Sequence, residues 1–373
     1  MKLKLNFMVL LCLAWFFVAI NGYAYNKEDV DKLKSGVRNL HGVDLSGADL
    51  SGIQAQNLIL TGANLSNAKL RNSDFTGTML NYANLNGADL EGTILKFCNL
   101  EYASLESSNL SKTDLQATFL SYSDFSKSTI QDANFSNAIF ENARINEAKV
   151  KGSNLTFIRL SGSDFSHSSI VASDFSDSDL TGTKFYRVIF MESKIINTSL
   201  NRADFSDSNL SGVDLKTSNL TGTNFTGSLL QNIHLKRTYN VGAVFRDAFI
   251  DNVDMEKGYC VGCDFTSAVL KDSSFINADF RGANLRNAVC FGSDFSGVDF
   301  VHTGFDMEHI NTLKEMGAQF NFHELSNVRE YGADFYNTDF TNVSLKQAKI
   351  NLRWKKLIQN FKVIFADTIE WIQ

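Results

Sequence analysis

Two cysteines three residues apart form the most conspicuous chemical motif in the sequence, Cys260-Val261-Gly262-Cys263. A CxxC spacing allows a disulfide between Cys260 and Cys263 if the protein reaches an oxidising compartment. The alternative is that both cysteines only fill the protein core, because each occupies an inward position of the repeat described below. The sequence favours packing and leaves the disulfide open.

The remaining residues that could do chemistry do not form a recognisable site. Only His302 and His309 lie at a spacing that could suit a shared metal ion, and two ligands do not make a zinc site. No Ser-His-Asp or Cys-His arrangement, phosphate-binding loop or carboxylate pair at a cleft can be assembled. We therefore predict no catalytic residue, no metal and no cofactor, and we expect that the protein is not an enzyme. The six histidines are His41, His167, His234, His302, His309 and His323.

A five-residue period organises most of the chain. From Leu40 to Ile350, every fifth residue is Leu, Phe, Ile, Met or Val at 57 of 63 positions. The residue two places earlier is Ala, Ser, Thr, Cys or Gly in 48 of these 63 units, and Asp or Asn most often lies between the two. The sequence contains no proline. A disordered chain would not be 44% hydrophobic, so a repetitive folded protein is expected.

A period of five fits neither an α-helix nor a plain β-strand. It fits a chain that turns a corner every five residues, so that four units close a square coil of 20 residues with the large and small residues inside. Units such as SGADL (46–50), TGANL (61–65) and RGANL (281–285) resemble the pentapeptide repeat family, whose A(D/N)LXX units build a right-handed quadrilateral parallel β-helix. The resemblance implies an all-β solenoid, and its 63 units would make nearly 16 coils.

The ends and one interruption differ from the repeat. We expect a short cap helix at the N-terminus, because Val30 and Leu33 have helical spacing and Gly36 can end the helix.

Residues 1–24 have a basic start, an apolar stretch and small residues before a cleavage site, which is typical of a signal peptide. The predicted segments are the signal peptide (1–24), the N-terminal cap helix (25–37), the solenoid (38–305), an interruption that is expected to be a helical excursion (306–331), the last repeats (332–350) and an amphipathic C-terminal helix (351–373).

The C-terminal segment changes to a helical period and carries a broad apolar stripe. A lid over the last coil is the preferred interpretation, and a homodimer through this helix is the alternative. The candidate dimer residues are Trp354, Leu357, Phe361 and Phe365. No second apolar run is long enough to span a membrane, so we expect no stable membrane span after cleavage of the signal peptide.

Residues 20 positions apart should lie above one another, which turns the sequence into a surface map. Two outward rows are apolar, and such rows either stabilise the stacked coils or bind a partner. The preferred candidate partner surface, here called the late stripe, is Ile189, Leu229, Phe249, Val269 and Val289. The second candidate, on the opposite face and here called the early surface, is Met79, Tyr82, Tyr102, Phe119 and Tyr122.

The other two faces are acidic, which bears on the best-known relatives that the resemblance suggests. These relatives resemble duplex DNA in shape and charge and protect DNA gyrase. Here 35 basic residues are interleaved with 41 acidic ones, giving a net charge of −6. This surface is too weakly charged for a good DNA mimic and unsuited to nucleic-acid binding.

The prediction is therefore an exported, non-enzymatic solenoid that acts as a protein-binding or structural rod with an unidentified protein partner. Its compartment would be the periplasm, the cell surface or the medium of a bacterium. The first alternative is a gyrase-protecting DNA mimic in the cytoplasm. The second is an exported enzyme with its chemistry in the 306–331 interruption.

Overall fold

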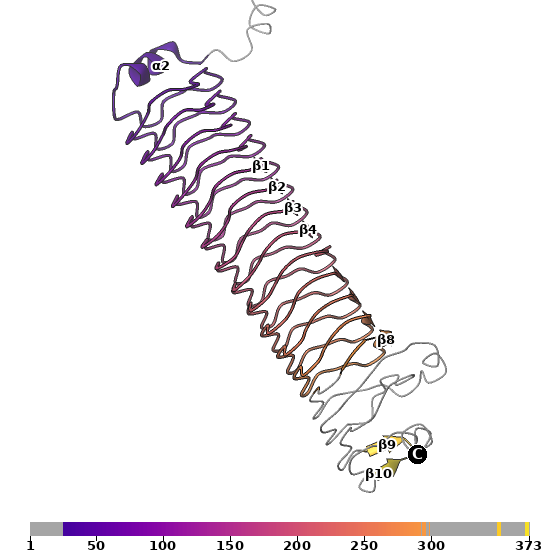
Figure 1. Cartoon of the computed structure of the whole chain (residues 1–373). Coiled ribbons are helices and arrows are strands. Elements are labelled where there is room, and N and C mark those ends of the chain that lie inside the picture. Colours follow the sequence, from indigo (N-terminus) through magenta and orange to yellow (C-terminus); the bar gives the residue numbers. More distant parts are fainter. Residues whose placement is uncertain (1–24, 292, 296–297, 299–348, 352–369, 373) are drawn as a thin grey trace, which may run out of the picture.

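The computed structural model describes residues 25–291, 293–295, 298, 349–351 and 370–372. Over the first of these ranges the chain winds into a parallel β-solenoid whose coils stack into a long rod (Figure 1). The described residues contain a single short α-helix, at the N-terminal end of the rod. The predicted all-β solenoid is thus confirmed. Its right-handedness, its four-sided section and its nearly 16 coils stay predictions.

Each coil pairs with the next at an offset of 20 residues. The parallel bridges begin with Asn39↔Ile59 and continue in the same register to Ser274↔Asp294. Hydrogen bonds join the coils along this register: the Leu40 N–H donates to the Ile59 carbonyl oxygen at 2.8 Å. Since backbone groups bond to the coil above or below, stacking satisfies donors and acceptors that a lone coil would leave unpaired.

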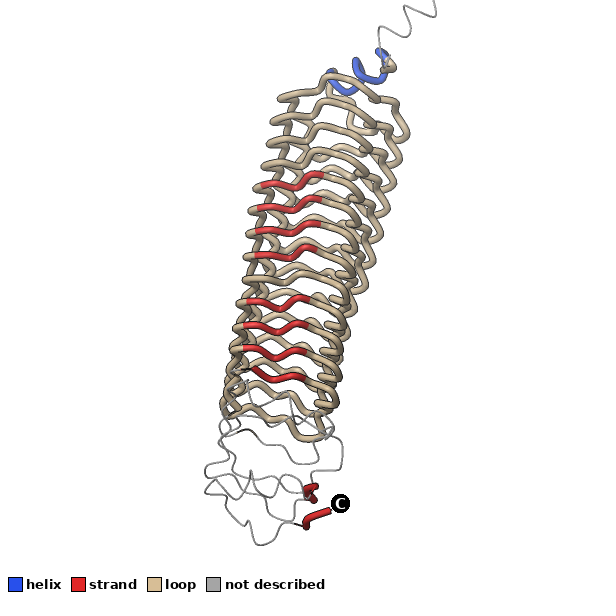
Figure 2. The backbone as a smooth tube through the Cα atoms, turned by 90° about the vertical axis from the view of Figure 1, so that its right-hand side faces the viewer, coloured by secondary structure: helices blue, strands red, loops and turns tan. Residues whose placement is uncertain are grey.

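Most of the pairing occurs as isolated bridges, and the regular strands are only three residues long (Figure 2). The first sheet has the order β1-β2-β3-β4, the second β5-β6-β7-β8, and β9 pairs with β10, all in parallel. The strands are β1 (Thr129–Gln131), β2 (Lys149–Lys151), β3 (Ser169–Val171), β4 (Ile189–Met191), β5 (Leu229–Gln231), β6 (Phe249–Asp251), β7 (Val269–Lys271), β8 (Val289–Phe291), β9 (Lys349–Asn351) and β10 (Glu370–Ile372).

The large residue of each unit fills the interior of the rod. Phe185 and Phe205 are fully buried, and their rings stack with centroids 4.6 Å apart and planes 9° apart. The column continues through Phe225 and Phe245 at centroid distances of 5.4 and 5.1 Å. Because identical rings recur at the coil spacing, each one contacts the rings above and below it, which gives offset aromatic stacking in addition to burial.

The small inward residue of a unit can also form a hydrogen bond to the previous coil. The hydroxyl of Thr78 donates to the carbonyl oxygen of Ala55 in the previous coil at 2.8 Å, and Thr93 donates to Leu70 in the same way. Both threonines are fully buried. A buried hydroxyl is tolerated when it has a hydrogen-bond partner, so Ser and Thr fit this position as well as Ala does.

The Asp or Asn of each unit stabilises the corner that follows it. Asp44 Oδ1 accepts the backbone N–H of Ser46 at 3.1 Å, which is the geometry of an Asx turn. The side chain of Asn64, one coil on, donates to the same Asp44 oxygen at 2.9 Å. The abundant aspartates therefore have a structural function before any other.

Helix α2 (Lys27–Lys34) packs on the first coil. The Asn26 side chain accepts the Glu28 N–H at its N-terminus, and Val30 and Leu33 are buried against the core. The Asp29 carboxylate accepts the backbone N–H of Asp44 at 3.0 Å, and this bond lowers the pKa of Asp29. The helix lies within the segment where the sequence predicts a cap.

At the C-terminus the structure differs from the expected helix over 351–373. Asn351 ends β9, and Glu370–Ile372 forms β10, which pairs with β9 in parallel. The helix prediction is therefore wrong at these residues. Trp and Ile favour strands when they can pair, and this pairing outweighs a helical spacing of apolar residues. Residues 352–369 lie outside the described part of the chain.

A neighbouring pair of substitutions tests whether the phenylalanine column holds the rod together. Phe185→Ala should lower the free energy of unfolding of the surrounding coils by about 3–5 kcal/mol, because it removes a buried ring and leaves a cavity. Lys184→Ala, at the adjacent exposed position, should change it by less than about 0.5 kcal/mol. Urea unfolding followed by circular dichroism would measure both, and equal effects would contradict the assignment of the core.

Candidate functional site

The late stripe lies on neighbouring coils of one face. Leu229, Phe249, Val269 and Val289 are consecutive partners in the register of β5 to β8. Ile189 joins them through Asn209, which bridges to both Ile189 and Leu229. The exposure of the stripe is modest: Ile189 is 48% exposed and Phe249 38%, whereas Leu229 and Val269 are half-buried.

The early surface is also brought together, and it is more exposed. Met79 and Phe119 lie in register on either side of Asn99. The rings of Tyr82, Tyr102 and Tyr122 stack with centroids 5.0 Å apart and planes within 7°. All five side chains are exposed, from 44% for Met79 to 60% for Tyr82. These exposed fractions are larger than those of Leu229, Phe249 and Val269, although the sequence ranks the late stripe first.

The surroundings also affect the hydroxyl groups of the three stacked tyrosines, Tyr82, Tyr102 and Tyr122, which are here called the tyrosine ladder. Desolvation raises the pKa of the Tyr102 hydroxyl, and the neighbouring Tyr122 and Tyr82 act in the same direction. All three tyrosines have φ near +60°, in the left-handed region that side chains other than Gly and Asn seldom adopt. The ladder therefore consists of three stacked, exposed rings held at corners of the coil.

Sequence reasoning missed exposed aromatic side chains at other corners. Phe97 and Phe157 are 59% and 57% exposed, each two residues after an inward leucine. Asn99, two residues after Phe97, lies between Met79 and Phe119 in the register, so Phe97 extends the early surface to its other edge. The signal in the sequence is limited: Phe97 has the same position in its five-residue unit as the three tyrosines, but it lies at a different corner of the coil. Tyr239 and Tyr259 form a further stacked pair, with centroids 5.0 Å apart.

The acidic faces are locally neutralised by ion pairs. Lys96 pairs with Asp114 at 2.9 Å and Arg144 with Asp124 at 3.6 Å. Arg71 pairs with both Asp89 and Glu91. These pairs join adjacent coils, so they link the stack and reduce the field that the carboxylates present to solvent.

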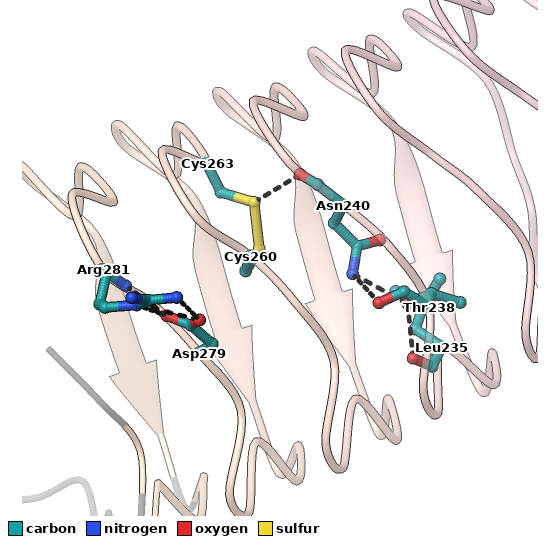
Figure 3. Close-up of a disulfide and its surroundings, with 7 residues drawn as sticks. All are labelled: Leu235, Thr238, Asn240, Cys260, Cys263, Asp279 and Arg281. Carbon is teal, nitrogen blue, oxygen red and sulfur yellow. Dashed lines mark hydrogen bonds and ion pairs between the residues drawn. A yellow bond between two sulfur atoms is a disulfide. The ribbon is translucent and has the colours of Figure 1, made fainter.

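The two cysteines of the CxxC motif lie fully buried, and the structure joins them in a disulfide (Figure 3). Cys263 Sγ lies 3.0 Å from the carbonyl oxygen of Asn240 in the previous coil. Asn240 itself replaces an apolar core residue, and its amide nitrogen donates to the Thr238 hydroxyl at 2.8 Å. Its buried side-chain oxygen has no hydrogen-bond partner, so this coil carries an unsatisfied polar group in the core.

Cys98 has no reactive setting. Cys98 is buried, and desolvation raises its pKa to about 12, so it is a poor nucleophile in the folded protein. Among the residues that the structure describes, no group of three or more His, Cys, Asp or Glu is placed to hold a metal ion. Within that same part, no helix has the length and apolar character needed to cross a membrane.

Other predictions fall outside the described residues. These are the signal peptide at 1–24, the interruption at 306–331, and the candidate dimer residues Trp354, Leu357, Phe361 and Phe365. They stay predictions.

A stack of 20-residue coils with aromatic and apolar rows on its faces defines a repeat solenoid. Sequence comparison assigns the particular class. The family model "Pentapeptide repeats" matches residues 59–96, 95–126, 120–156 and 263–300, and "Pentapeptide repeat region" matches 168–245. Together they cover more than half of the chain, which belongs to the pentapeptide repeat family. No curated protein matches it in sequence.

Solved structures of low similarity include other repeat proteins. Trypsin-treated QnrB1, a plasmid-mediated fluoroquinolone resistance protein, is 18% identical, with 45% of this chain and 88% of that one covered and a TM-score of 0.41. HetL, from the cyanobacterium Nostoc sp. strain PCC 7120 and involved in heterocyst differentiation regulation, is 20% identical, with 79% and 97% covered and a TM-score of 0.28. At these scores the likeness carries no argument about function.

Alkylation tests the disulfide. In the denatured protein, iodoacetamide should label Cys98 before reduction, and it should label Cys260 and Cys263 only after reduction. In the folded protein, Cys98 should resist labelling because it is buried with a raised pKa. Peptide mass spectrometry reads all three sites. Labelling of Cys260 and Cys263 in the unreduced, denatured protein would show that both cysteines only fill the core.

Proposed function

We propose that the protein is an exported, non-enzymatic pentapeptide-repeat rod that binds a protein partner through its apolar faces. The rod would be a right-handed quadrilateral helix of nearly 16 coils. The observation that carries the proposal is the early surface, where Met79, Phe119 and the tyrosine ladder expose apolar and aromatic side chains on neighbouring coils. Contiguous exposed apolar patches on a monomer mark interaction sites.

The physical form of the early surface suits recognition. Tyr and Phe are enriched at the centres of protein interfaces because they supply a large contact area with little side-chain entropy. In this protein the Tyr102 side chain has little conformational entropy left to lose on binding, because it is already held between Tyr82 and Tyr122. A partner that docks on a surface already fixed in this way loses less free energy on ordering it.

The late stripe is the second binding candidate. Phe249 is its most exposed side chain in the sheet β5–β8, and the half-buried Leu229 and Val269 on either side would add a flat aliphatic rim. A homodimer through the C-terminal segment remains an alternative use of the rod.

The gyrase-protecting alternative is less well supported. A DNA mimic must present carboxylates densely, since duplex DNA carries about one charge per 1.7 Å of its axis. In this rod, carboxylates such as Asp114, Asp124 and Asp264 are each paired with a lysine or arginine from a neighbouring coil. They also accept hydrogen bonds within the corners and from the next coil, as Asp114 does from the Gln116 N–H and from the Asn134 side chain.

Two double variants test the early surface and the late stripe. The repeat itself suggests substitutions that should preserve the fold. Asp is common in the slot before the large core residue, where Met79, Phe119, Phe249 and Val269 lie. Met79→Asp with Phe119→Asp, and Phe249→Asp with Val269→Asp, should therefore keep the fold and its unfolding temperature. We expect the first pair to abolish retention of the partner, measured by affinity purification from a tagged chromosomal copy and quantitative mass spectrometry.

The same purification reports export through the intact mass of the protein. The proposal expects a chain that begins at Tyr25, recovered outside the cytoplasm, and a protein retained by the wild type but lost from one double variant. The second double variant serves as the matched control for the first. A full-length chain in the cytoplasm would refute export, and identical retained proteins on all three baits would refute partner binding through these faces.

A further inference from the structure

An open pocket of about 400 Å³ lies on a face of the rod that neither apolar surface uses. Its floor is His234, Asp254 and Ser274, which are consecutive partners in the 20-residue register. Since the coils stack at roughly 4.8 Å, these three side chains form a polar row with one group per coil. A pocket of this volume is within the range of small-molecule sites in proteins.

The rim of the pocket adds planar amides. Asn232 and Asn252 occupy corresponding corners of adjacent coils, with φ of 56° and 53°. The side-chain nitrogen of Asn252 donates to the side-chain oxygen of Asn232 at 2.6 Å. This bond orders the two amides, so that their remaining donors and acceptors are fixed at the edge of the pocket.

The charges around the pocket are largely compensated. Glu256, on the opposite rim, pairs with Lys236 and with Lys257. Asp272 pairs with Lys271 at 3.4 Å. A ligand that pairs with Glu256 or Asp272 would have to compete with these lysines, and a neutral ligand would not.

The floor keeps hydrogen-bonding capacity for a ligand. One Asp254 oxygen accepts the Glu256 N–H at 3.0 Å, and in the described part of the chain no lysine or arginine lies within ion-pair distance of this carboxylate. Among the described residues, no side-chain hydrogen bond involves His234 or Ser274. The floor thus offers a carboxylate acceptor, an imidazole and a hydroxyl in one line.

We propose that this pocket binds a neutral polyhydroxylated ligand, one or two sugar rings of a saccharide. Each sugar hydroxyl both donates and accepts a hydrogen bond, and the pocket supplies both functions side by side from Asp254, His234, Ser274 and the two amides. The row of groups follows the rod axis, so an elongated saccharide would lie along the rod. This function goes beyond partner binding through the apolar faces and does not depend on it.

Histidine resonances allow a direct test on the full protein. Maltose, cellobiose, lactose and chitobiose would each be titrated into protein labelled at histidine, with the His234 ring signals as the reporter and those of His167 as the internal reference. We expect at least one disaccharide to shift the His234 signals in a saturable way, while the His167 signals stay unchanged.

A matched pair of variants assigns the binding to the pocket. Asp254→Ala should weaken the binding of that disaccharide by about tenfold or more, because it removes a charged acceptor from the floor. Asp174→Ala is the control: Asp174 lies on the same face and makes the same corner bond, to the Ser176 N–H at 3.0 Å, but far from the pocket. It should leave the affinity unchanged.

Three results would overturn the proposal. The first is that none of the four disaccharides shifts the His234 signals. The second is that Asp254→Ala and Asp174→Ala bind the active disaccharide equally well. The third is that the diamine cadaverine shifts the His234 signals and the sugars do not, which would assign the pocket to ammonium groups. None of these results bears on the apolar faces, which neither variant changes.

Discussion

The structure depends on one constraint, the parallel hydrogen bonding of each coil to the next at an offset of 20 residues. This register satisfies the backbone and brings every large inward side chain over its equivalent, so the phenylalanine column from Phe185 to Phe265 is a consequence of it. The same register stacks the outward side chains. A row of apolar residues on the surface is therefore specified by the same pairing that specifies the core.

Much of this architecture can be read from the sequence, because a five-residue period has few physical solutions and an unbroken phase fixes which residues share a face. The stacking of Tyr82, Tyr102 and Tyr122 follows from that arithmetic alone. Three features cannot be predicted from the period alone. The bond from the Thr78 hydroxyl to Ala55 needs the depth of the interior, and the exposure of Phe97 needs the corner geometry. The strand β10 depends on a pairing partner, so helical spacing alone misleads there.

The register also supports the proposal that the faces bind a partner. The aspartates that would be the natural acids and bases are used by the corners, as Asp44 is by Ser46, or are paired between coils, as Asp114 is with Lys96. The exposed groups that remain are aromatic and aliphatic rows, which can supply contact area, and the row of His234, Asp254 and Ser274, which can supply hydrogen bonds. Both kinds of surface are rigid, because each belongs to the stacked scaffold and not to a loop. Different binding functions can therefore be placed on different faces without disturbing the core.

The central claim, that one 20-residue register decides which residues meet on a face, is tested most directly by coil deletion combined with cysteine crosslinking. Ile189→Cys and Leu229→Cys lie two coils apart, with Asn209 between them. Deletion of one whole coil, residues 205–224, should bring the two cysteines into direct register, within the distance of a disulfide, and crosslink them under mild oxidation. Deletion of half a coil, residues 205–214, keeps the five-residue period but should move Leu229→Cys to the opposite face and abolish the crosslink. A crosslink in the half-coil deletion, or none in a folded whole-coil deletion, would contradict the account.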